Sequence, residues 1–256
     1  MRIVVFDTET TSIDKPFCYN IGWVVYDTES GCIVHFADYV VEQIWHNKEL
    51  FTTAYYADKR EQYVSRMRGK TCRMEKFGYI TQTMARVFKE YEVEMAFAYN
   101  SSFDERVFEY NCDWFKCINP FDDIPIFDIR AFVHNKIAFT PSYQAFCDKH
   151  KLYTESGNYS TTAESVYRFL MGSTEFIEEH TALADSQIEL EILCECIKRG
   201  CEWGKTYKTY RTIRRKVEKT LVVKDTEGGI TEFPYGEITI YKEKDRKVKI
   251  NLRSSK

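Results

Sequence analysis

The 256-residue sequence has no run of 18 apolar residues, so we expect no membrane-spanning helix. Its first residues lack the basic, then apolar, then small-residue order of a signal peptide. None of its nine cysteines forms a C-x-x-C pair, and Cys194, Cys196 and Cys201 have no partner histidines, which argues against a zinc site. These absences favour a cytoplasmic protein with reduced, mostly buried thiols.

The composition suits a folded domain with an uneven distribution of charge. Hydrophobic residues make up 44% of the chain and aromatic residues 16%, which is ample for a sizeable core. The net charge of −3 divides into about −10 for residues 1–200 and +7 for residues 201–256. A basic tail beside an acidic domain suits contacts with phosphates, but it equally suits a tail that only aids solubility. We expect a main domain over 1–204 and a basic extension over 205–256.

The first eleven residues carry the clearest chemical signal. The run from Ile3 to Phe6 is apolar and rich in β-branched residues, as in a strand buried on both faces. Asp7 and Glu9 follow two positions apart, so their carboxylates point to the same side of the sheet. Two like charges at a core edge need a cation, and oxygen ligands favour Mg²⁺ or Mn²⁺. The alternative is an ordinary solvated acidic pair at the end of a strand.

Hydrophobic periodicity predicts alternating strands and helices after this opening. A hairpin turn is expected at residues 28–31, so that the first three strands form an antiparallel meander. Residues 43–73 give a weak signal and are expected to be helical in part. Ser102 and Glu105 form a capping-box pattern at the start of a helix. The further strands are expected at 19–26, 32–41, 95–99 and 126–129, and the helices at 74–91, 103–114, 141–150, 161–170 and 182–199.

Two more acidic residues occupy positions that invite a chemical interpretation. Asp104 lies in the first turn of a helix just after a strand, where complementing the helix dipole would explain it alone. Asp185 shares the inward stripe of the last helix with Ile188 and Ile192, and an acid there is costly unless it is paired or bound to metal. His180 precedes Asp185 by five residues, and taken singly it suits an ordinary surface or capping histidine.

Three blocks, read together, resemble the DEDDh exonucleases, the DnaQ-like family with a ribonuclease H-like fold. The blocks are FDTETT (6–11), AYNSSFD (98–104) and HTALADSQ (180–187). The resemblance covers roughly residues 1–200, and its second block departs from the family by having Tyr99 where many members have histidine. It implies an α/β fold with a five-stranded mixed sheet flanked by helices.

The resemblance also implies a set of site residues and their roles. Asp7 would bridge two divalent ions, Mg²⁺ or Mn²⁺, that flank a scissile phosphate. Glu9 and Asp185 would complete the site of the first ion, and Asp104 would hold the second. His180 would accept the proton of the attacking water. The expected substrate-binding residues are Thr10, Thr11, Asn100 and Phe103, with Phe103 equally well explained as a core residue.

The implied function is a metal-dependent 3′–5′ exonuclease that acts on single-stranded 3′ ends, with DNA favoured. The alternatives are an exoribonuclease that trims RNA 3′ ends and a nucleic-acid-binding accessory module with little catalysis. The resemblance does not reach the tail, where seven basic residues, Tyr207 and Tyr210 predict a phosphate-binding helix over 205–220. Short strands at 221–223 and within 230–252 predict a small β appendage or an arm that binds a protein partner.

Overall fold

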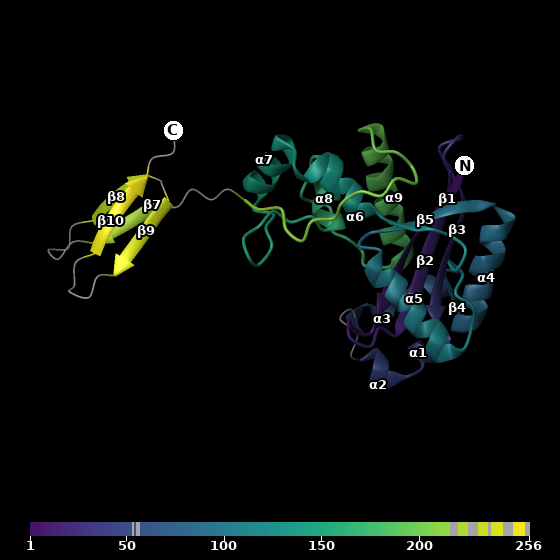
Figure 1. Ribbon diagram of the computed structural model, residues 1–256. Helices are drawn as coiled ribbons and strands as arrows, with labels where there is room; N and C mark the ends of the chain where they lie inside the picture. The colour runs from purple at the N-terminus through teal and green to yellow at the C-terminus, as the bar shows by residue number, and fades with distance from the viewer. Residues whose placement is uncertain are drawn as a thin grey trace. The chain divides into compact units, whose positions relative to one another are not determined.

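The computed structural model describes residues 1–52, 54, 57–215, 220–224, 230–234, 237–242 and 248–253 (Figure 1). The chain divides into two compact units, Met1–Ile213 and Arg214–Lys256. None of the helices among the described residues combines the length and the apolar character needed to cross a bilayer.

A mixed sheet of six strands forms the centre of the first unit, in the order β4-β3-β2-β1-β5-β6. β1 pairs antiparallel with β2 and parallel with β5, and the β1–β2–β3 meander is as predicted. The expected count of five strands was wrong, because the three residues of β4 pair in parallel with the end of β3. The strands are β1 (Arg2–Thr10), β2 (Cys18–Asp27), β3 (Cys32–Val41), β4 (Arg73–Glu75), β5 (Val93–Ala98) and β6 (Ile126–Asp128).

Helices cover both faces of this sheet, and the five long predicted helices are all present within a few residues of their expected bounds. The stretch that gave a weak signal is helical in part, as expected. The helices are α1 (Glu42–Trp45), α2 (Lys48–Phe51), the 3₁₀ turn η1 (Ala57–Lys59), α3 (Arg60–Arg68), α4 (Phe77–Glu90), α5 (Ser102–Phe115), α6 (Ile129–Val133), the π-helical turn η2 (His134–Ala138), α7 (Pro141–His150), α8 (Ala163–Met171) and α9 (Ala182–Lys198).

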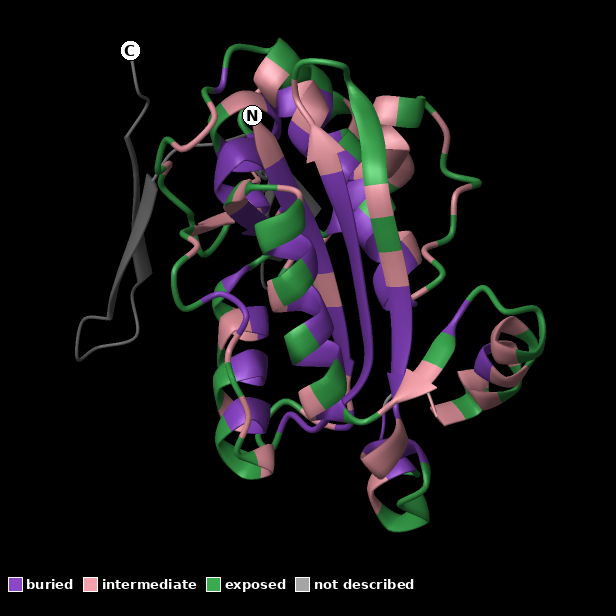
Figure 2. Ribbon diagram, turned by 90° about the vertical axis from the view of Figure 1, so that its right-hand side faces the viewer, coloured by how far each residue is buried: buried purple, intermediate pink, exposed green. Residues whose placement is uncertain are grey.

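Strand β1 lies between two apolar layers, which explains its unbroken run of hydrophobic residues. Val4 and Phe6 pack with residues of α4 and α5, and the ring of Phe6 stacks on Phe121 at 4.3 Å. Ile3 and Val5 point to the opposite layer, which contains residues of α6 and α9. Figure 2 shows β1 and β2 buried along most of their length. Because β1 is buried on both faces, its position in the core determines where Asp7 and Glu9 lie at the edge of the sheet.

The amino end of α9 lies directly on β2. A Cβ added at Gly22 would lie only 2.1 Å from the backbone nitrogen of Leu183, so no other residue fits there without displacing the helix. Two hydrogen bonds hold the same contact: Ala182 N donates to Asn20 Oδ1 at 2.8 Å, and Ser186 Oγ donates to Gly22 O at 3.1 Å. This contact sets where the first turn of α9 stands relative to the sheet.

Local capping differs from the prediction in two places. The capping box of Ser102 and Glu105 is wrong, because α5 begins at Ser102 and the hydroxyl of Ser101 donates to Glu105 Oε1 at 2.8 Å. The last strand ends at Asp128, whose carboxylate accepts a hydrogen bond from Arg130 N at 2.9 Å and caps the unpredicted helix α6.

The start of the basic extension is not a helix. Residues 205–215 are irregular, and Ile213, which is 1% exposed, pairs with Tyr159 in an isolated bridge. Residues 216–219 of the expected helix lie outside the described residues. The second unit contains two antiparallel strand pairs, as the expected short strands required. These strands are β7 (Thr220–Lys224), β8 (Ile230–Pro234), β9 (Glu237–Lys242) and β10 (Val248–Arg253).

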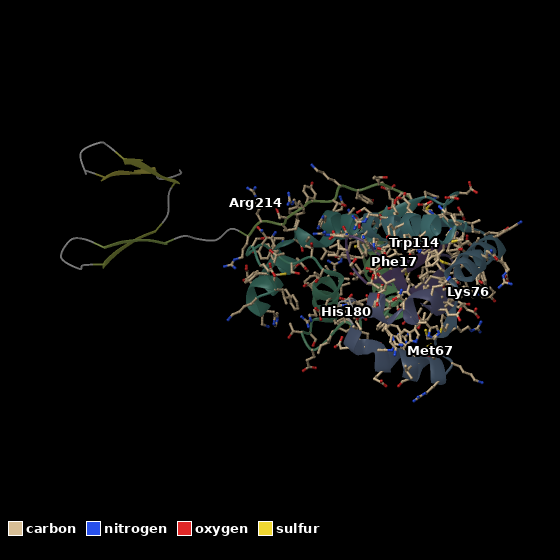
Figure 3. The ribbon with its side chains drawn as sticks, turned by 90° about the horizontal axis from the view of Figure 1, so that it is seen from below. Phe17, Met67, Lys76, Trp114, His180 and Arg214 are labelled. Atoms are coloured by element: carbon tan, nitrogen blue, oxygen red, sulfur yellow. The ribbon has the colours of Figure 1, made fainter. Side chains whose placement is uncertain are left out.

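All nine cysteines are free, and six of them are buried, which agrees with the expectation of mostly buried side chains. Edge-to-face aromatic pairs add to the packing at the periphery, as between Phe17 and Trp114, whose ring centroids lie 5.1 Å apart (Figure 3).

The contact at Gly22 yields a stability prediction. Gly22→Ala forces backbone atoms of α9 away from β2, and we expect a loss at or above the upper end of the roughly 1–3 kcal/mol typical of overpacking. Denaturant unfolding measures it. Gly69→Ala is the matched control, since its added Cβ meets nothing closer than 3.4 Å. Equal stability of the two variants would contradict the close approach of α9.

Candidate active site

Strand β1 delivers two carboxylates to one edge of the sheet. Asp7 stands opposite Gly22 of β2, and Glu9 stands opposite Asn20, so both lie beside the start of α9. Glu9 is 9% exposed, and the hydroxyl of Tyr19 lies 3.5 Å from its Oε2 as a hydrogen-bond donor. Asp7 and Glu9 therefore lie on the same side of the sheet, as predicted, and together form one acidic wall.

The loop before α9 and the first turn of α9 bring His180 and Asp185 to that wall. The ligand atoms of Glu9, His180 and Asp185 all lie within 4.8 Å of one another. Asp185 is 5% exposed, and its Oδ1 atom has no hydrogen-bond partner within the described part of the chain. His180, labelled in Figure 3, has a left-handed backbone (φ 50°), and its Nδ1 lies 3.8 Å from Glu178 Oε2.

Helix α5 adds the fourth predicted acid. Asp104 lies in its first turn, as expected, but it is only 3% exposed and lines the same cavity as Asp7. Its Oδ1 accepts a hydrogen bond of 2.6 Å from the hydroxyl of Thr8, the residue between the two acids of β1. Complementing a helix dipole does not require such burial, and the Asp104 carboxylate instead lines the cavity.

A fifth carboxylate, Glu189, was missed. It lies one helical turn after Asp185, is 3% exposed and lines the cavity. Its Oε2 accepts a hydrogen bond of 3.3 Å from the backbone nitrogen of Tyr99 at the end of β5. The signal was available in the sequence, because Glu189 lies between Ile188 and Ile192 on the inward stripe of α9.

Burial raises the pKa of every acid in the cluster, and repulsion from neighbouring carboxylates adds to it. Burial is the largest cause for Asp7, followed by the charge of Glu189. Burial raises the pKa of Asp104 to about 7 and that of Asp185 to about 8, with Glu178 adding repulsion at Asp185. The pKa values of Glu9 and Glu189 lie well above the ordinary value for the same first cause. The ionised cluster is unfavourable without a compensating positive charge.

The donor set fits divalent metal. Carboxylate oxygens with one imidazole suit Mg²⁺ or Mn²⁺, and one ligand atom from each of Glu9, His180 and Asp185 lies close enough to the others to share an ion. Among the described residues, Asp185 Oδ1 is buried and has no hydrogen-bond donor, so a cation would compensate it. Asp7, Glu9, Asp104 and Asp185 are the residues that would hold such ions.

The cavity in front of the cluster has a volume of about 540 Å³. Asn100 and Phe103 contribute to its wall, as do Arg130 and Arg211. Asn100 has a left-handed backbone (φ 62°), and its nitrogen donates to Asp128 Oδ1 at 2.9 Å. Phe103 is half-buried. Tyr99 and Thr161 also line the cavity, and the hydroxyl of Tyr99 donates to Thr161 O at 2.7 Å.

The structure does not bring Thr10 and Thr11 into this cavity. Thr11 is 3% exposed, and its backbone nitrogen already donates to Phe17 O at 2.9 Å. Their expected contact with the last nucleotide stays a prediction.

Comparison with known proteins identifies the fold. No protein-family model matches the sequence, and no curated protein resembles it significantly in sequence. The nuclease domain of 3'hExo, a DEDDh family member bound to rAMP, is similar in structure with a TM-score of 0.56 at 13% identity, over 83% of this chain and 97% of that one. A 3'-exonuclease that recognises the histone mRNA stem-loop gives 0.53 at 13%, over 98% and 76%. Cell-death related nuclease 4 (CRN-4) gives 0.52 at 12%, over 88% and 69%.

The cluster predicts how the metal-free protein responds to pH. An acid whose pKa is raised by folding binds more protons in the folded state, so stability falls as pH rises. For Asp185 the fall runs from about pH 4, the pKa of an unfolded aspartate, to about pH 8. We expect the melting temperature, measured with a chelator present, to decrease over this range.

Glu189→Gln removes one of the repelling charges, so it should raise the melting temperature at pH 8 and make the decrease shallower. Glu191→Gln on the exposed side of the same helix is the control and should change neither. If the Glu189→Gln variant has the same melting temperature and pH dependence as the control, the charge of Glu189 does not repel the other carboxylates of the cluster.

Proposed function

We propose that this chain, which has the fold of the DEDDh exonucleases, is a metal-dependent 3′–5′ exonuclease that removes nucleotides from single-stranded 3′ ends. One observation carries the proposal: strand β1, helix α5 and helix α9 converge on one cavity with Asp7, Glu9, Asp104, Asp185 and His180. These elements are distant in sequence, so the convergence is a property of the fold. A cytoplasmic location, favoured by the free thiols, belongs to the same proposal.

The residues of the cavity have distinct tasks in this proposal. Two divalent ions, when bound, would supply an activated water and stabilise the leaving 3′-oxygen. Asp7, Glu9, Asp104 and Asp185 hold that site. His180 accepts the proton of the attacking water through a ring nitrogen, because burial lowers its pKa and keeps the ring neutral at neutral pH. Phe103 offers a face on which the terminal base stacks.

RNA is the second candidate substrate. Two of the structural neighbours are named with rAMP and with a histone mRNA stem-loop, which supports an exoribonuclease that trims RNA 3′ ends. Matched labelled DNA and RNA oligonucleotides, each assayed with Mg²⁺ and with Mn²⁺, decide between the two sugars.

Two other expectations receive less support. A binding module without catalysis has no use for six carboxylates in one cavity that repel phosphate. The expected protein partner of the extension has no support among the described residues, whereas Arg211 of the extension lines the cavity itself.

The acidic residues should carry the metal dependence. Asp7→Ala and Asp185→Ala are expected to abolish nuclease activity while keeping the fold, with a higher melting temperature in chelator because repulsion is relieved. Nuclease assays with Mg²⁺ and thermal unfolding measure the two effects. Asp113→Ala, at an exposed position on α5, is the control and should keep full activity. Full nuclease activity of the Asp7→Ala variant would contradict the proposed function.

His180 should affect turnover more than binding. His180→Ala is expected to lower kcat by roughly 10²–10⁴-fold, the usual effect of losing a general base, with little change in oligonucleotide affinity. Because the pKa of His180 lies below 6.5, the wild-type rate should rise with pH in the acidic range and level off near neutrality. Single-turnover kinetics across pH measure both. A variant with normal turnover and weak binding would make His180 a binding residue.

A further inference from the structure

A second cavity, of about 600 Å³, lies along the edge of β3 and has no part in the chemistry described above. Strand β4 pairs only with Tyr39–Val41, so the preceding residues of β3 have no strand neighbour on that side among the described residues. The loop between α3 and β4 forms one wall of this cavity, and the carboxyl-terminal half of α4 forms the other. We call this cavity the edge groove.

The lining of the edge groove is positively charged. Its cations are Arg66, Lys70, Arg73 and Arg86, and its acids are Asp38 and Glu90. Asp38 is already matched, since its buried carboxylate forms an ion pair of 2.9 Å with Arg66. Lys70, Arg73 and Arg86 are exposed, and Glu90 is the one lining acid left to balance them. The groove therefore attracts anions, although residues 1–200 carry a net charge of about −10.

Two residues that line the edge groove have a buried polar atom without a partner among the described residues. Within the described residues, Arg66 Nη1 and His35 Nε2 are buried and make no hydrogen bond. Both residues line the groove. A buried guanidinium nitrogen without an acceptor is costly, so the Arg66 guanidinium is only partly compensated by its ion pair with Asp38.

The groove lies close to the acidic cluster. Asp7, Gly22 and Asp38 are consecutive partners across β1, β2 and β3, so the backbones at Asp7 and Asp38 are two strand spacings apart, about 10 Å. Buried hydrogen bonds also link the two regions. Asn20 Nδ2 donates to Asp38 Oδ1 at 2.7 Å, and Asn20 Oδ1 accepts from Ala182 N at the start of α9.

We infer that the edge groove binds backbone phosphates of the substrate strand upstream of its 3′ end. This inference rests on the proposed exonuclease function. Guanidinium groups match phosphate oxygens in geometry and charge. The groove thus holds a long strand on a domain whose overall charge repels it.

The test compares two triple variants of equal net charge. Lys70, Arg73 and Arg86 are replaced by alanine in the first. Lys48, Lys76 and Lys89, which are exposed and do not line the groove, are replaced in the second (Lys76 is labelled in Figure 3). Both carry Asp7→Asn to prevent cleavage. Fluorescence anisotropy then measures the affinity for an oligonucleotide of about 12 nucleotides as a function of salt.

The groove variant should flatten the slope of log K against log salt by about 2, since each phosphate contact on a single strand contributes about 0.7. The control variant should keep the wild-type slope, and a trinucleotide should bind all three proteins alike. Equal slopes for the two triple variants would overturn the inference. So would a mononucleotide that binds the wild type and not the groove variant, because the groove would then hold a free nucleotide.

Trinucleotide cleavage, measured with Asp7 intact, separates this inference from the proposed function. Cleavage by wild type and by the groove variant supports the exonuclease proposal whatever the slopes are. Absence of cleavage by the wild type contradicts that proposal itself.

Discussion

The amino end of α9 rests on β2 with no side chain between them, because Gly22 has no Cβ. Asp185 belongs to the first turn of that helix, and Asp7 is the register partner of Gly22. The distance between Asp7 and Asp185 is therefore set by a contact between two backbones. The hydrogen bond from Ala182 N to Asn20 Oδ1 fixes the orientation of the start of α9 on the sheet. A side chain at position 22 would move half of the cluster away from the other half.

The same contact forces acids together that repel one another. Six carboxylates line one cavity, those of Asp7, Glu9, Asp104, Glu178, Asp185 and Glu189, and burial raises the pKa of each. Packing elsewhere must offset this repulsion, and the two apolar layers on either side of β1 provide it. The apolar core thus supplies the stability that the repelling carboxylates cost. Because these carboxylates are already held together, the cavity favours the binding of positive charge.

Much of this arrangement could be predicted from residues with a clear environment. The run from Ile3 to Phe6 identified the central strand, and helical periodicity located the five long helices. The short β4 could not be predicted, because three residues show no period and their pairing depends on β3. Residues 205–215 have the composition of a basic helix, but tertiary contacts decide otherwise: Tyr210 N donates to His134 Nδ1, and Thr209 Oγ1 donates to Asp128 Oδ2. Glu189 was predictable in principle, since it shares the stripe of Asp185.

The bond between Asn20 and Ala182 spans 162 residues of chain. At a synthesis rate of roughly 5–20 residues per second, the first strands wait roughly 8–32 s for the helix that covers them. During that interval the apolar face of β1 and β2 that α9 later buries has no permanent cover, and Asp7 and Glu9 remain hydrated and free of their later acidic neighbours. The apolar surface that α9 buries is therefore exposed until this helix has been synthesised, and the acidic cavity forms only after that.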